Sequence, residues 1–158
     1  MRSVISLNPN MERIRNFVQL TENFGTAGQP SADQFSIIAE NGYLHVINIG
    51  MPDHPDALSN EGELVSGLGM NYVHIPVPFD NPTPEHISLF CNLISQIKRD
   101  KIFIHCIMNH RVSAFMYHYL SKVEKRNESD SRSIIFQKWD MEPAWKKVMS
   151  WSATDLGL

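Results

Sequence analysis

One short segment, His105-Cys106-Ile107-Met108-Asn109-His110-Arg111, combines residue types that can perform nucleophilic chemistry on an anion. It follows an apolar run typical of a buried strand and precedes a helical pattern that begins near Arg111. The N-terminus of a helix stabilises a thiolate and binds anions through its free backbone N–H groups. An arginine guanidinium matches two oxygens of a phosphate group. The spacing of Cys106 and Arg111 therefore predicts a site for a tetrahedral oxyanion.

The loop backbone is expected to contribute more rate than the acidity of the thiol. An ordinary thiol is already about 3% ionised at neutral pH, so a lower pKa gains at most ~30-fold. One preorganised donor at a transferring group contributes roughly 10²–10³. The donors expected here are the guanidinium of Arg111 and the N–H groups of Ile107, Met108, Asn109 and His110.

The elements that would position this loop alternate between apolar runs and helical patterns, which is typical of an α/β domain. Strands are predicted within 24–30, which also contains the turn Gly28-Gln29-Pro30, and over 44–49, 72–75 and 101–105. Helices are predicted over 31–42, 60–68 and 111–125, and after Thr83-Pro84. The run 101–105 is apolar on both faces and therefore central. The stretch 125–132 is expected to be a loop, and the tail with Trp139, Trp145 and Trp151 to pack back as one or two short helices.

Length, charge and cysteine content narrow the class of protein. The 158 residues suit one domain, 1–158, and the two cysteines exclude a disulfide scaffold. A net charge of −3 argues against a nucleic-acid partner, and no segment has the ~20 apolar residues of a membrane span. The first ten residues lack the apolar core of a signal peptide, so a soluble, cytoplasmic protein is expected.

The loop resembles the His-Cys-x5-Arg-Ser/Thr loop of the protein tyrosine and dual-specificity phosphatases. Over most of its length the chain is more closely similar to a bacterial family of tyrosine-phosphatase-like proteins of unassigned function, related to the domain beside β-lactamase-like hydrolases. This likeness is carried by four segments besides the strand end at His105: 26–30, 46–49, 76–80 and 106–115. The resemblance implies a cysteine-phosphatase-like, mostly parallel central sheet flanked by helices. It also implies a phosphocysteine mechanism without a cofactor, with Cys106 as nucleophile, Arg111 as phosphate clamp and the Ser113 hydroxyl assisting the thiolate.

The loop departs from the superfamily pattern in its length. Four residues separate Cys106 from Arg111 instead of five. Losing one residue shortens the reach by up to ~3.5 Å and rotates a helical side chain by ~100°. Asn109 stands where the superfamily has glycine, and asparagine tolerates the left-handed conformation. The closer bacterial family that the chain resembles shares the shorter loop.

Phosphoryl transfer also needs a proton donor for the leaving oxygen. By its place before the long helix, Asp80 corresponds to the superfamily's aspartic acid, although its setting in Asp80-Asn81-Pro82 equally suits a turn. The alternative donors are His110 inside the loop and, further away, Asp53, His54 and Glu61.

Other residues have simpler interpretations. His105 is expected to orient the loop by hydrogen bonds from inside the sheet, and Cys91 to pack in the core on a helical stripe. A metal site made of His105, Cys106 and His110 is not expected, because no second Cys/His cluster completes four ligands.

The sequence leaves three functions open. The first is hydrolysis of phosphate monoesters, on a phosphorylated protein or small molecule, through a phosphocysteine at Cys106. The second is a pseudophosphatase that binds phosphate without turnover. The third is thiol redox chemistry or sulfur transfer by Cys106. The substrate and the oligomeric state are not encoded in any pattern that we identify.

Overall fold

The fold is built on a five-stranded sheet. The computed structural model describes residues 9–158, so the apolar run within residues 1–8 lies outside it. The strand order is β1-β2-β5-β3-β4, with β1 antiparallel to β2 and the other neighbours parallel. The strands are β1 Val18–Gln19, β2 Phe24–Ala27, β3 His45–Asn48, β4 Asn71–His74 and β5 Ile102–His105.

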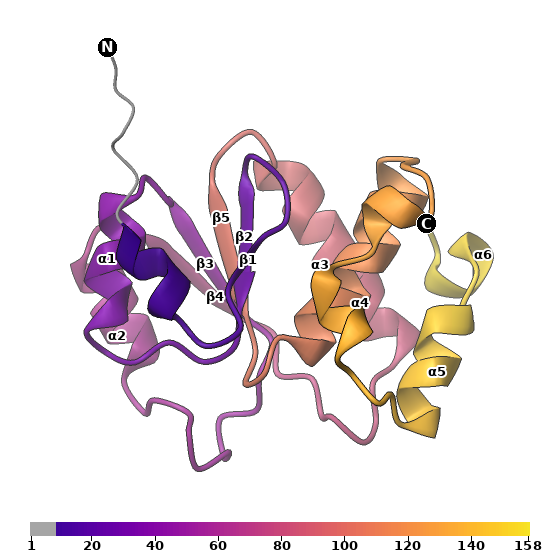
Figure 1. The fold of residues 1–158 in the computed structure, drawn as a ribbon, viewed down its shortest axis with the longest axis horizontal. Helices are drawn as coiled ribbons and strands as arrows, with labels where there is room; N and C mark the ends of the chain where they lie inside the picture. Colours follow the sequence, from indigo (N-terminus) through magenta and orange to yellow (C-terminus); the bar gives the residue numbers. More distant parts are fainter. Residues whose placement is uncertain (1–8) are drawn as a thin grey trace.

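Helices cover both faces of this sheet (Figure 1). One face carries α1 Gln34–Glu40 and α2 Glu61–Gly67, and the other carries α3 Pro84–Ile97, α4 His110–His118, α5 Pro143–Ser150 and α6 Ala153–Leu156. Each face has its own apolar cluster: Phe35, Val46 and Phe103 belong to the first, and Ile47, Ile104 and Phe115 to the second. The predicted α/β class and mostly parallel sheet are confirmed.

The central position of β5 follows from its sequence. Its four residues are all buried, and it pairs with β2 on one side and with β3 on the other. A strand without a polar face fits only where helices cover both sides of the sheet. Figure 1 shows the segments after β3, β4 and β5 at the same end of the sheet, which is where parallel strands of an α/β protein present ligand sites.

Local signals set the start of α3 as expected, whereas α1 begins after the predicted capping box: its N-cap is Asp33, which makes no side-chain cap hydrogen bond. The Gln34 side chain accepts a hydrogen bond from the Ser31 N–H at 3.0 Å, and Thr83 forms a capping box with His86. Gly42 and Gly69 have φ of +85° and +86° where α1 and α2 end, a conformation that favours glycine.

Three features differ from the sequence-based expectation. No strand was predicted where the short strand β1 lies. The helix that begins near the loop is α-helical only to His118 and then continues as a π-helical turn, Tyr119–Val123. The predicted loop 125–132 contains a 3₁₀ turn, Ser129–Ser131, and further 3₁₀ helices cover Pro9–Arg13 and Ile134–Gln137.

The C-terminal tail packs back on the domain, as expected. Trp139 and Trp145 are buried in the cluster that contains α3 and α4, and Trp151 packs against it. Within residues 9–158, no helix is long and apolar enough to span a membrane.

Candidate active site

The loop 106–110 is held against the turn after β2. The Gln29 N–H donates to the Ile107 carbonyl at 3.0 Å, and the Cys106 N–H donates to Ala27 at 3.3 Å. A Cβ on Gly28 would lie 2.3 Å from the Ile107 carbonyl oxygen, so this approach requires glycine. The turn predicted at Gly28-Gln29-Pro30 is therefore part of the support for the loop.

Asn109 closes the loop at the start of α4. Its φ of 68° is left-handed, as the sequence allowed, and its side-chain amide donates to the Asn16 carbonyl at 2.8 Å. The Ser113 hydroxyl donates to the Asn109 carbonyl at 2.6 Å, so it is engaged with the loop backbone. Asparagine and serine together fix the entry into the helix.

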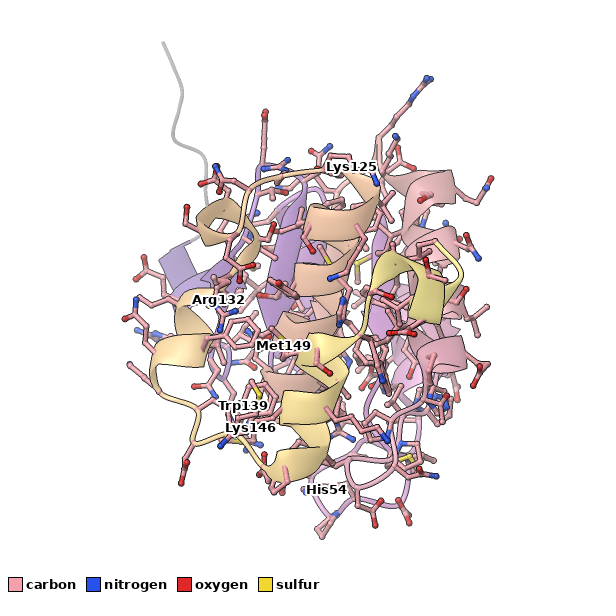
Figure 2. All side chains as sticks on the ribbon, turned by 90° about the vertical axis from the view of Figure 1, so that its right-hand side faces the viewer. His54, Lys125, Arg132, Trp139, Lys146 and Met149 are labelled. Atoms are coloured by element: carbon pink, nitrogen blue, oxygen red, sulfur yellow. The ribbon has the colours of Figure 1, made fainter. Side chains whose placement is uncertain are left out.

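Cys106 and Arg111 line a common cavity of about 520 Å³. Their side chains are otherwise buried, with residue exposures of 1% and 5%. The cavity is lined by Met51, Asp53, His54, Pro55, Phe79, Cys106, Ile107, Met108, His110 and Arg111. The structure thus brings together Arg111, four loop residues that include the proposed acid His110, and two further proposed acids, Asp53 and His54. His54 lies at the lower edge of the molecule in Figure 2.

The guanidinium of Arg111 is fixed from one side. Its Nη1 donates to the Val77 carbonyl at 2.8 Å, and its Cζ lies 5.4 Å from the centre of the Phe79 ring. Among the described residues, its buried Nε has no hydrogen-bond partner. A buried cation that lines a cavity is suited to an anion.

The proton-donor candidates fall into two groups. Asp80 is exposed and does not line the cavity, although its neighbour Phe79 does. Asp53, His54 and His110 line it. Glu61 is buried, contacts His105 and does not line this cavity. Its position therefore does not suit a proton donor to a substrate bound there.

The ring of His110 stacks on Trp139 with a centroid distance of 4.6 Å, and Figure 2 shows Trp139 beside α5. Burial lowers the pKa of His110; the nearby Glu142 opposes this change, and the positive charge of Arg111 adds to it. A neutral His110 is therefore favoured near neutral pH.

His105 lies behind the loop with no exposed surface. Its Nε2 is 2.6 Å from Glu61 Oε2, and its Nδ1 is 3.0 Å from the Cys106 carbonyl oxygen. Gln29 donates to the other Glu61 oxygen at 2.8 Å. The orienting role expected for His105 matches this geometry, whereas the partnership with Glu61 was missed because the two residues are 44 positions apart.

The other cysteine lies in a different environment. Burial raises the pKa of Cys91 to about 12, only partly opposed by Lys122. Its expected place in the apolar core is confirmed. Among residues 9–158, no three His, Cys, Asp or Glu side chains are grouped so that they could hold a metal ion.

Fold and loop together define a domain of the tyrosine and dual-specificity phosphatase type. A family model for dual-specificity and tyrosine phosphatase domains fused to NAD⁺ kinase matches residues 9–142. The chain belongs to this family.

Known relatives agree with this assignment. A β-lactamase hydrolase-like protein of Xylella fastidiosa (strain Temecula1) is 30% identical over 110 residues, which are 67% of this chain and 25% of that protein. The chain thus matches about a quarter of the length of its curated relatives.

Solved structures show the same fold. A DUF442 protein of Shewanella putrefaciens CN-32, provisionally assigned as a phosphatase, is 31% identical with a TM-score of 0.80, covering 89% of this chain and 93% of that one. The core catalytic domain of the PP-IP phosphatase SIW14 of S. cerevisiae is 12% identical with a TM-score of 0.70, covering 91% and 90%. The second likeness concerns the fold alone.

Proposed function

We propose that the chain hydrolyses phosphate monoesters through a phosphocysteine intermediate at Cys106. The observation that carries this proposal is the common cavity that Cys106 and the buried cation Arg111 line together. Membership of a phosphatase family supports a phosphorylated substrate, protein or small molecule.

In the first step the Cys106 thiolate attacks phosphorus and the ester P–O bond breaks. The electron pair of that bond passes to the leaving oxygen, which takes a proton from the general acid. In the second step water attacks the phosphocysteine, the P–S bond breaks, and its electron pair returns to sulfur. The same acid, now a base, accepts the proton of the water. Arg111 and the loop N–H groups, with Ser113 as their support, stabilise the charge on the phosphoryl oxygens.

We propose Asp80 as the first candidate for the general acid. The segment that contains Asp80 forms part of the cavity wall through Phe79. Asp53 is the second candidate, because it lies in the lining itself. Loss of the true acid by Asp→Asn substitution should slow hydrolysis of an alkyl phosphate ~10²-fold, and that of an activated aryl phosphate much less.

A catalytically silent phosphate-binding module is the second candidate function. The shortened loop and the exposed position of Asp80 favour it. In that case phosphate would stabilise the fold, Arg111→Ala would remove this effect, and Cys106→Ser would not.

The test is metal-independent hydrolysis of an aryl phosphate from mildly acidic to neutral pH. We expect turnover that vanadate inhibits and that Cys106→Ser abolishes, while the matched variant Cys91→Ser keeps it. A folded protein that binds phosphate but shows no turnover would replace the first candidate by the second.

A further inference from the structure

The surroundings of the cavity at Cys106 carry an excess of negative charge. Its walls come largely from the segments that follow β3, β4 and β5 at one end of the sheet (Figure 1). A fourth segment adjoins them, because Trp139 stacks on the ring of His110. The four segments are 50–59, 75–84, 106–110 and 139–143. They contain no lysine or arginine, but they contain five acidic residues: Asp53, Asp56, Asp80, Asp140 and Glu142.

Three of the segments present an acidic residue at or next to the lining. Asp53 lines the cavity and is exposed, and its carboxylate has no hydrogen-bond or ion-pair partner within residues 9–158. Asp80 is exposed directly after Phe79, which belongs to the lining. Glu142 accepts a hydrogen bond from the Trp139 indole at 3.0 Å, and its charge reaches His110. Negative charge is therefore spread around the cavity.

Positive charge is concentrated at one point of the lining. Among the described residues that line the cavity, Arg111 is the only lysine or arginine, and it is buried. His110 adds little, because burial lowers its pKa and favours the neutral ring. In the mechanism proposed above, the phosphate of the substrate occupies Arg111, so a second anionic group would meet carboxylates without a cation in the lining.

One further cation lies at the rim and is already paired. Arg15 Nη1 lies 3.0 Å from Asp56 Oδ2 and 3.5 Å from the carbonyl oxygen of Ile107, a lining residue. Both partners of the ion pair are partly exposed. Asp56 therefore offsets the positive charge that Arg15 would otherwise present beside the cavity.

We propose that the chain selects phosphate monoesters whose alcohol part carries a positive charge, with Asp53 and Asp56 as specificity-determining residues. This inference rests on the proposed function, because it places the phosphate at Arg111. It agrees with Asp80 as the general acid, since Asp53 acts here as a carboxylate. Phosphates of amino alcohols, and phosphorylated side chains beside lysine or arginine, share the required chemistry.

The test compares aryl phosphates that differ in charge away from the phosphate. Tyramine phosphate carries an ammonium group, para-cresyl phosphate is neutral, and the phosphate of para-hydroxyphenylpropionic acid carries a carboxylate. Their phenol leaving groups are closely similar. We expect kcat/KM to be about tenfold higher for the ammonium ester than for the carboxylate ester at low ionic strength, and this ratio to shrink in ~0.5 M salt. Equal values at low ionic strength would overturn the inference.

The ion pair at the rim separates charge from structural damage. Asp56→Asn removes a negative charge and releases Arg15, so the ratio should fall about threefold. Arg15→Gln breaks the same ion pair but removes the positive charge, so the ratio should rise about threefold. Changes in the same direction would show that the pair acts through structure alone and would contradict the proposal.

Asp53→Asn should lower the ratio about threefold whatever it does to the individual rates. The matched control is Asp130→Asn, which removes an exposed acid from the turn Ser129–Ser131, outside the four segments. It should leave the ratio unchanged. An equal fall in both variants would assign the preference to the net charge of the protein and overturn the role of the cavity.

Phosphotyrosine peptides with lysine or with glutamate beside the phosphorylated residue distinguish the two sources of such a substrate. The lysine peptide should exceed the glutamate peptide, and its kcat/KM relative to tyramine phosphate shows whether a protein or a small amine is preferred. If no ester is hydrolysed, the proposed function fails. The affinities of the same esters for the unmodified protein, measured by calorimetry, then decide this inference: tighter binding of the ammonium ester sustains it, and equal binding refutes it.

Discussion

Two regions of the molecule each contain one buried histidine and one buried cysteine, in opposite environments. The loop region holds His105 and Cys106 at the end of β5, and the helix region holds Cys91 on α3 and His118 on α4. Burial is nearly complete at all four. The loop region adds a carboxylate, a guanidinium and a cavity.

In the helix region the buried histidine has fewer hydrogen-bond partners than His105 has in the loop region. His118 Nε2 donates to the Val148 carbonyl at 2.8 Å, but its buried Nδ1 has no partner among the described residues. Burial lowers the pKa of His118 to about 4, with Val148 opposing the change and Lys122 adding to it. The comparison teaches that burial by itself keeps a histidine and a cysteine neutral, and that specific partners are needed to hold charge inside the fold.

The largest expected contrast is between the two thiols. At pH 7 a thiol with a pKa of about 12 is ionised to only ~10⁻⁵. We expect a small alkylating reagent to modify Cys106 completely before Cys91 reacts, as measured by peptide mass spectrometry. Phosphate should protect Cys106. Equal labelling rates in the folded protein would break the comparison.

A second contrast concerns the cations of the two regions. Arg111→Ala should lower kcat/KM on an aryl phosphate by roughly 10³-fold, because it removes the donors closest to the transferring group. Lys122→Ala removes a positive charge from the helix region and should leave kcat/KM unchanged. If the two variants lose activity equally, the loss reflects stability, which thermal unfolding of both would reveal.

The third contrast is the pH dependence of stability. An unfolded histidine takes up a proton near its ordinary pKa of 6.5, whereas folded His118 does so only at about 4. Stability should therefore fall as pH decreases through this window, by roughly 3 kcal/mol for this group. His118→Gln should remove that part of the slope in denaturant titrations, whereas His54→Gln, at an exposed position, should not.

The sequence alone predicts those parts of the fold and of the site that depend on local patterns. The apolar run at β5, the N-cap Thr83 before Pro84, and the loop from Cys106 to Arg111 lie where they were expected. These features depend on neighbouring residues, so periodicity and end signals predict them.

The missing parts depend on contacts between distant segments. The pairing of Glu61 with His105 joins the start of α2 to the end of β5, and no local pattern distinguishes a buried glutamate from the exposed acids usual at a helix start. Whether Asp53 or Asp80 faces the cavity depends on the course of two irregular segments. Strand β1 has only two residues, too few for a period to be recognised.

The smallest expected effect tests whether the two regions are independent. Trp145 on α5, the helix that accepts the hydrogen bond from His118, donates from its indole Nε1 to the Phe79 carbonyl at 2.7 Å. Phe79 lies under the guanidinium of Arg111, so the helix region supports one wall of the cavity.

Trp145→Phe keeps most of the apolar contact and should cost about 1 kcal/mol of unfolding free energy for the lost hydrogen bond. If Phe79 needs this bond for its position, KM for an aryl phosphate should rise. An unchanged KM in the destabilised variant would mean that the helix region holds the fold together without influencing the site.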